Sequence, residues 1–323
     1  MNEQTLLTML LETAPEAGAA QPPAQADVLL LQQLSRDQLQ ARVRRFVSLL
    51  REQDGCPNDD GGSWKQSDGH TVIHLAEGAR AVLYHASGAL RYVSGLAPAT
   101  LPFTRGTEHD TLLRLVQERA LKLKLADWDA SAAGAQAELR FEHLFRTLGR
   151  GTDRAGKQSE ATLFRAIGAY RQFVGNIPVL GAASAAVQVA GGGQLDALSI
   201  LTRPGRGEVL DRAAIVEPRD GARRLLGQLS VLLGQREIPG DAVESALMQF
   251  GYLDLGKRKP QRVLAPAYVA KIVLRHRRVR QAYVLAVAAT ERSYLEMPVF
   301  GNEAPVTRGR TDVGRCGGAE DSR

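Results

Sequence analysis

The chain has 323 residues, of which 44% are hydrophobic, 24% are charged and 5% are aromatic, and its formal net charge is +6. This composition is that of a globular protein, and the length favours two or three domains over one. No apolar run approaches the roughly 18 residues that a membrane-spanning helix needs. The two cysteines, Cys56 and Cys316, lie near opposite ends of the chain and exclude a disulfide scaffold.

The N-terminal residues predict a short amphipathic helix because Leu6, Leu7, Leu10 and Leu11 recur at helical spacing. The segment starts with an acidic residue rather than a basic one, so no secretory signal peptide is expected and the chain is predicted to be cytoplasmic as written. Residues 14–27 are rich in Pro, Ala and Gln, which is typical of a linker.

A second helix is predicted to follow this linker. Ser35 and Gln38 have the spacing of a capping box, and apolar residues recur on one face as far as Leu50. Residues 54–69 are rich in Asp and Gly and predict a loop. The period then changes from helical to two, which predicts a small meander with strands over 70–76, 80–85 and 90–94.

A helix followed by an antiparallel meander is then predicted twice. The first helix is capped by Thr107 and precedes strands over 139–147, 162–173, 177–189 and 194–202. Gly205–Gly207 is assigned to a turn. The second helix starts at Pro218 and precedes strands over 243–255, 262–274 and 280–289. We therefore expect an α+β protein of tandem units, each with one helix packed on an antiparallel sheet, rather than a doubly wound parallel sheet.

These predictions divide the chain into five parts. They are an N-terminal helical arm with its linker (1–60), a small β-meander (61–105), a first helix-plus-sheet unit (106–210), a second such unit (211–300) and a disordered, Gly-rich tail (301–323). The N-terminal helix has three possible roles: it docks on its own protein, drives oligomerisation or serves as a targeting device.

The histidines of the meander are the candidate metal ligands. If Glu77 and Gly78 form a two-residue hairpin turn, His70 lies opposite His85, and His74 shares a face with His70. A metal-dependent enzyme that uses these side chains is one alternative. Half-exposed strand positions without a metal-binding motif are the simpler interpretation, so no metal ligand and no cofactor is assigned.

No catalytic residue is assigned either. The sequence has no Gly-x-Ser-x-Gly motif, no His-Glu-x-x-His helix and no phosphate-binding loop. Cys56 lies in an acidic segment, where nearby carboxylates disfavour the thiolate. Gly191–Gly193 lies between two strands and is predicted to be a hairpin turn.

One segment makes the protein basic. Between Lys257 and Thr290 there are nine basic residues and no acidic one, and the rest of the chain has 32 basic against 35 acidic residues. The expected anion-binding residues are Lys257, Arg258, Lys259, Arg275, Arg277 and Arg278, which flank one strand and are expected to cluster at one end or edge of the second sheet. Binding of a nucleic acid or another polyanion is therefore a second alternative, although the same charges also discourage pairing of a sheet edge.

One stretch resembles a known family. Tyr170-Arg-Gln-Phe-Val-Gly-Asn-Ile-Pro178-Val-Leu-Gly181, followed by Val187-Gln-Val189, a Gly run and Leu195-Asp-Ala-Leu198, is similar to the PepSY/FTP class of propeptide-type domains that precede thermolysin-like proteases. The later Leu264-Ala-Pro266-Ala-Tyr268 is similar to a second strand of such modules. The resemblance covers about 107–290 and implies a cystatin-like sheet wrapped round a helix, a secreted or cell-envelope location, and inhibition or chaperoning of a peptidase.

We therefore expect a non-enzymatic protein that binds a protein or peptide partner, with a peptidase as the partner class that the resemblance implies. The expected partner-binding residues are Tyr170, Gly175, Pro178 and Gly181, at the crossover between two strands. Exposed sheet edges are the other expected contact surface, because an edge offers unpaired backbone groups to an added strand.

Overall fold

The computed structural model describes residues 3–12, 21–54, 63–75, 78–128, 137–181, 184–234, 242–276 and 279–297. The helices in this part of the chain are α1 (Glu3–Glu12), α2 (Arg36–Asp54), α3 (His109–Lys122) and α4 (Pro218–Leu232), with short 3-10 turns η2 (Leu125–Asp127) and η3 (Gly191–Gly193). None of these helices is long and apolar enough to cross a membrane.

The strands outnumber the helices. They are β1 (Gln25–Leu31), β2 (Trp64–Ser67), β3 (His70–His74), β4 (Arg80–Tyr84), β5 (Leu90–Val93), β6 (Ala137–Gly149), β7 (Thr162–Val174), β8 (Ile177–Leu180), β9 (Ala185–Val189), β10 (Leu195–Ile200), β11 (Gly205–Ala214), β12 (Val243–Leu253), β13 (Val263–Leu264), β14 (Pro266–His276) and β15 (Val279–Ala288).

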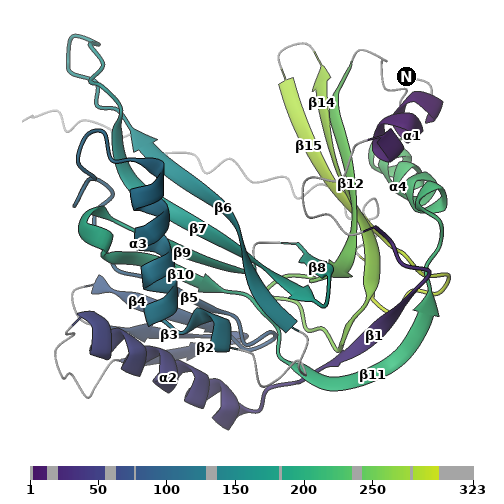
Figure 1. Cartoon of the computed structure of the whole chain (residues 1–323), viewed down its shortest axis with the longest axis horizontal. Coiled ribbons are helices and arrows are strands. Elements are labelled where there is room, and N and C mark those ends of the chain that lie inside the picture. Colours follow the sequence, from purple (N-terminus) through teal and green to yellow (C-terminus); the bar gives the residue numbers. More distant parts are fainter. Residues whose placement is uncertain are drawn as a thin grey trace, which may run out of the picture.

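Twelve strands join in one mixed sheet, in the order β15-β14-β12-β8-β7-β9-β10-β5-β4-β3-β2, with β6 on the other edge of β7. The short strand β8 connects the two halves of this sheet. It pairs antiparallel with the end of β7, at Val174↔Ile177, and parallel with β12, at Tyr252↔Val179. The halves diverge from this connection, as Figure 1 shows.

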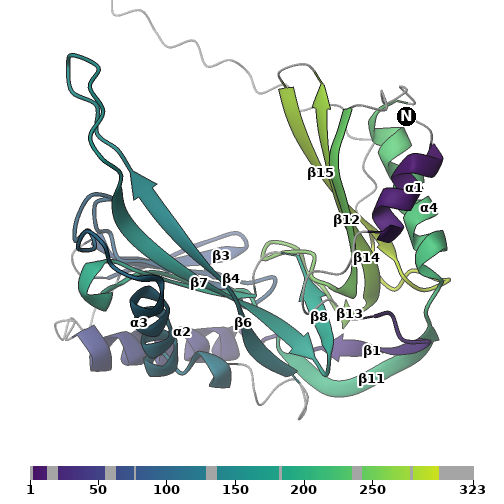
Figure 2. The same cartoon turned by 45° about the horizontal axis from the view of Figure 1, so that its top comes forward.

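Two helices cover each half of the sheet, on the sides that face away from one another (Figures 1 and 2). In the first half, α2 and α3 share one core with β3–β5, β7, β9 and β10, in which Phe46, Leu112 and Val116 are completely buried. In the second half, α1 and α4 pack on β12, β14 and β15, and Leu6 and Leu10 of α1 are buried against Leu225 of α4. The N-terminal helix thus docks on its own protein.

A separate three-stranded sheet, β11-β1-β13, lies beside the connection between the halves. Strand β1 pairs with β11 from Gln25↔Ala214 to Leu31↔Gly205, and it pairs with β13 at Leu29↔Leu264. Val28 of β1 is completely buried in a small core with residues of β13 and β14.

The expected fold class is wrong. Tandem cystatin-like units would each have one helix on a sheet of their own, whereas here the predicted meander joins the same sheet as β7, β9 and β10. Two helices rather than one cover each half, and the pairing of β8 with β12 is parallel. The physical reason is that β8 hydrogen-bonds to β7 in one half and to β12 in the other. The two halves therefore form one continuous sheet instead of two separate units.

Several local predictions also need correction. Strands β1, β2 and β11 were not expected, and residues 177–189 form two strands rather than one.

The capping box of α2 is confirmed, because the backbone N–H of Ser35 donates to Gln38 and the N–H of Gln38 donates to Ser35. Thr107 does not cap α3: its hydroxyl donates to the carbonyl of Thr104, and the helix begins at His109. The predicted tail over 301–323 lies outside the described residues.

Candidate functional site

Strand β6 is a long edge strand. Its 13 residues pair with β7 from Ala137↔Val174 to Gly149↔Thr162, and no other described strand pairs with it. The β6–β7 hairpin extends beyond the rest of the sheet in both views (Figures 1 and 2). An edge of this length presents a row of backbone N–H and C=O groups to which another chain can hydrogen-bond.

Large apolar side chains of β6 are exposed on both faces of the sheet. Phe145 is 51% exposed and pairs with Ile167 on the face that α3 does not cover. Phe141 is 37% exposed and packs edge-to-face on Tyr170, with ring centroids 5.6 Å apart, on the face that α3 covers. Leu148, near the end of the strand, is 61% exposed. Apolar contacts are therefore available to alternate side chains of an added strand on either face.

The charges along β6 are unevenly compensated. The carboxylate of Glu138 is bound by Arg140, and that of Glu142 by Arg171, with Arg171 Nε 2.6 Å from Glu142 Oε1. In contrast, the side chain of Arg146 forms no ion pair with any described residue. The strand thus keeps an uncompensated positive charge in its second half.

The turn that follows β6 adds to this charge. Arg150, Arg154 and Lys157 are exposed and form no ion pair among the described residues. Asp153 accepts hydrogen bonds from the backbone of its own turn, at Ala155 and Lys157, and Glu160 is bound by Arg105 at 2.8 Å. The surroundings of this half of β6 therefore favour an acidic partner.

Two of the expected partner-binding residues lie directly beside β6. Tyr170 is buried, only 8% exposed, under Phe141, and burial raises the pKa of its hydroxyl to about 12. Gly175 forms the turn between β7 and β8 with a φ of +58°, which favours glycine. Arg140 donates a hydrogen bond to the carbonyl of Gly175 at 3.1 Å and stacks on the ring of Phe173.

The other two, Pro178 and Gly181, lie where β8 crosses to the second half. Pro178 is buried, and its carbonyl lies so close to Gly251 that a Cβ there would be 2.4 Å away. Gly181 has a φ of +133° beside the carbonyl of Asp254. Tyr170 and Gly175 thus contact residues of β6, whereas Pro178 and Gly181 lie beside the second half. Direct contact between the four residues and a partner stays a prediction.

The expected anion-binding residues do not cluster. Because Tyr252 pairs with Pro266 and Arg275 pairs with Arg280, the loop with Lys257 and the hairpin after β14 lie at opposite ends of the strand. An 11-residue strand separates them by roughly 35 Å.

The two basic groups also differ in their partners. Lys257 stacks on the ring of Tyr84, with Nζ 4.8 Å from the centroid, while Arg258 and Lys259 are exposed. Arg275 and Arg280 both bind Glu244. Arg277 and Arg278 lie outside the described residues. Binding of a polyanion stays a prediction.

The predicted pairing of the meander histidines is wrong by one residue. His70 pairs with Tyr84 rather than with His85, and a shift of one residue turns a side chain to the other face. His85 instead hydrogen-bonds to Thr71, with Nε2 2.8 Å from Oγ1, and His70 to Ser67. No group of three His, Cys, Asp or Glu side chains with metal-binding geometry occurs among the described residues. Cys56 and Cys316 lie outside them.

The exposed residues of β6 were not singled out from the sequence. The available signal was that apolar residues occupy both odd and even positions of the segment, namely Phe141, Leu144, Phe145 and Leu148. The same segment also contains four charged residues from Glu138 to Arg146. A strand with one face in the core alternates apolar and polar residues, and this one does not.

No family model matches the chain, and no curated protein shows significant similarity to it. Among solved structures, the crystal structure of an uncharacterized protein from Eubacterium rectale ATCC 33656 is similar, with a TM-score of 0.47 and 10% sequence identity. The similarity covers 84% of this chain and 86% of that chain.

Proposed function

We propose that this is a non-enzymatic polypeptide-binding protein, in which β6 accepts an extended, acidic segment of a partner as an additional strand. One observation carries the proposal: a 13-residue edge strand, unpaired on one side among the described residues, combines exposed Phe145 and Leu148 with the uncompensated cation of Arg146. Backbone hydrogen bonds would supply affinity, and contacts to alternate side chains would supply specificity.

The charges and the apolar contacts select different features of the added strand. Phe145 and Leu148 favour aromatic or β-branched side chains at the positions opposite them. Arg146 and Arg150 favour carboxylates near those positions, whereas Glu138 and Glu142 are already bound by arginines of this chain. Complementary charge raises the rate of encounter as well as the specificity.

Two other partner classes follow from different observations than the β6 edge. A peptidase that is inhibited or chaperoned follows only from the resemblance of residues 170–181 to propeptide-type domains, and it stays a prediction. A nucleic acid would need the basic loop at Lys257–Lys259 instead of β6, so the two partner classes depend on different residues.

The test is a selection of random 12-residue peptides displayed on phage, followed by affinity measurement of the selected peptides. The variants are Phe145→Ser and Arg146→Glu, both at exposed positions where the fold should tolerate a change. The controls are Leu121→Ser on α3, where the side chain is 79% exposed, and Arg219→Glu in the first turn of α4. An acid in a first turn suits the helix dipole.

We expect the wild-type protein to select acidic, β-prone sequences. Each β6 variant should weaken their binding about tenfold or more, because it removes an apolar contact that the bound strand would bury or reverses the matching charge. The controls should leave binding unchanged. Selection of sequences that bind the β6 variants and the wild type equally well would show that β6 is not the binding site.

A further inference from the structure

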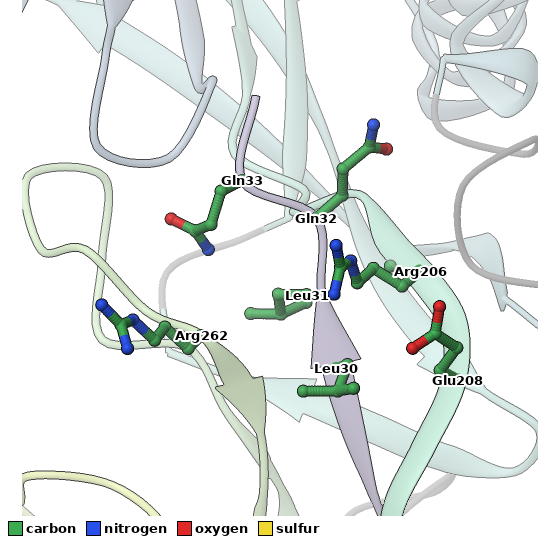
Figure 3. A pocket seen from close by; sticks show the side chains of 8 residues that line it. Leu30, Leu31, Gln32, Gln33, Arg206, Glu208 and Arg262 are labelled. Atoms are coloured by element: carbon green, nitrogen blue, oxygen red, sulfur yellow. The ribbon is translucent and has the colours of Figure 1, made fainter. Parts of the chain in front are cut away.

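A pocket of about 490 Å³ lies at the end of β1, between β11 and the segment that leads into β13. Figure 3 shows Arg206 directed from β11 toward the end of β1, beside Leu31, with Glu208 on the same strand and Arg262 on the other side of β1. Two carboxamide side chains, Gln32 and Gln33, complete the polar part of the lining. This pocket is separate from β6 in both its strands and its residues.

An irregular pairing of β1 with β11 creates the pocket. Leu29 pairs with Val209 and Leu31 pairs with Gly205, so four residue steps along β11 match two along β1. The extra residues bulge away from β1, and Gly207 supplies the positive φ of +74° that such a bulge needs. Arg206 and Glu208 consequently lie beside the end of β1 without being paired with residues of β1.

The charged side chains of the pocket are available to a ligand. Arg206, Glu208 and Arg262 are exposed, and no ion pair joins any of them to another described residue. Arg206 and Glu208 have opposite charges on one strand yet do not bind each other. Gln33 uses its amide group to donate to the carbonyl of Gln261 at 2.9 Å, which leaves its own carbonyl free to accept.

We propose that this pocket binds a small zwitterion that carries an α-amino group and a carboxylate, as a free amino acid or a dipeptide does. The guanidinium of Arg206 binds the carboxylate, for which its planar donors are suited. The carboxylate of Glu208 binds the ammonium group. Figure 3 shows both side chains on the same side of β1, an arrangement that lets one zwitterion contact both of them.

The rest of the lining fits the remainder of such a ligand. Leu30 is partly exposed and offers apolar contact to a side chain, and Gln32 offers both a donor and an acceptor. A volume of about 490 Å³ is within the range of small-molecule sites. It leaves room for more than the main chain of one amino acid, which is why a dipeptide is included in the ligand class.

Isothermal titration calorimetry tests the proposal, with the full-length protein and a panel of the twenty amino acids and twenty Gly-Xaa dipeptides. At least one compound should bind with a dissociation constant below about 1 mM. Arg206→Gln and Glu208→Gln should each weaken that binding about tenfold or more. Arg212→Gln, at a 72% exposed position of the same strand, is the matched control and should leave it unchanged.

Blocked ligands separate the two charge contacts. The C-terminal amide of the bound compound should lose affinity in the wild type, and so should its N-acetyl derivative. Binding that depends on Arg206 but survives both N-acetylation and Glu208→Gln would identify a simple anion site and overturn the proposal. So would the absence of any bound compound up to about 10 mM. Circular dichroism of each variant verifies that the fold is retained.

Discussion

Arg203 and Asp254 form a buried ion pair that joins the connection between β10 and β11 to the loop after β12. Arg203 Nε lies 2.6 Å from Asp254 Oδ1, and the two side chains are 5% and 10% exposed. The same guanidinium donates to the carbonyls of Gly256, at 2.7 Å, and Lys259, at 2.9 Å. A single arginine thus holds the basic loop of the second half against the segment that leaves the first half.

Removal of this arginine should destabilise the protein. Arg203→Ala leaves the carboxylate of Asp254 buried without its counter-ion, and the expected loss in free energy of unfolding is about 3–5 kcal/mol. Urea unfolding followed by circular dichroism measures it. Arg223→Ala breaks an exposed pair with Asp220 and should change stability by less than about 1 kcal/mol. Equal effects of the two variants would contradict the role of Arg203.

A second buried pair should make stability depend on pH. Burial by itself raises the pKa of Asp196, but hydrogen bonds from Ser94, Arg165 and Gln188 and the charge of Arg165 outweigh it and lower that pKa below its ordinary value of 3.8. A carboxyl group with a lowered folded-state pKa stabilises the fold fully above its unfolded-state pKa, and this contribution is lost as pH falls through the folded-state value.

The variant Asp196→Asn isolates this contribution. At pH 7 it should be less stable than the wild type by about 3 kcal/mol, because Arg165 loses its buried counter-ion. The difference should persist down to about pH 4 and shrink below it, as Asp196 becomes protonated in the wild type. Denaturant titrations at pH 7, 5, 4 and 3 measure the trend. If the stability difference between Asp196→Asn and the wild type grew as pH fell, the lowered pKa of Asp196 would be contradicted.

Gly251 permits the close approach of β12 to β8. A Cβ at this position would lie 2.4 Å from the carbonyl oxygen of Pro178, so Gly251→Ala should destabilise the protein by about 1–3 kcal/mol. Gly227 on α4 is the matched control, because a Cβ at that position would have no atom within 4 Å other than those of its chain neighbours and its own helix backbone. Alanine also favours a helix by up to about 1 kcal/mol over glycine. Thermal unfolding should therefore show shifts of opposite sign for the two Gly→Ala changes.

Tyr170 should be replaceable by phenylalanine. Its hydroxyl is buried and has no hydrogen-bond partner among the described residues, so Tyr170→Phe removes a desolvated polar group without removing a contact of the ring with Phe141. Stability should stay equal or rise by up to about 1 kcal/mol. If peptide binding at β6 fell while stability was retained, the Tyr170 hydroxyl would contact the partner directly, and the role of Tyr170 would not be limited to packing against Phe141.

Local patterns in the sequence predicted most elements of the fold. Helical spacing located α2, α3 and α4, and period-two alternation located strands such as β3–β5 and β7 close to their observed bounds. Strands β1 and β11 were missed because each is stabilised by pairing with residues about 180 positions away, as in Ala26↔Ala213. Local composition near a linker and near Gly205 favoured a coil and a turn instead.

The joining of two sheets by β8 was equally inaccessible to local patterns. The apolar run over 177–189 gave no indication that its first four residues pair with two different strands. The zwitterion pocket combines residues near positions 32, 206 and 262, which only the pairing of β1 with β11 and β13 brings together. For β6, the strand itself was predicted, but its place at a sheet edge depends on the order of all the other strands.

Amide hydrogen exchange of β6 tests the proposed function most directly. In an antiparallel pair, alternate residues direct their N–H groups toward the neighbouring strand and away from it. Without a ligand, the outward amides of residues 137–149 should exchange fast, and a selected acidic peptide should slow them while leaving α1 and α4 unchanged. Slowing elsewhere in the molecule with no change in β6 would contradict strand addition at this edge.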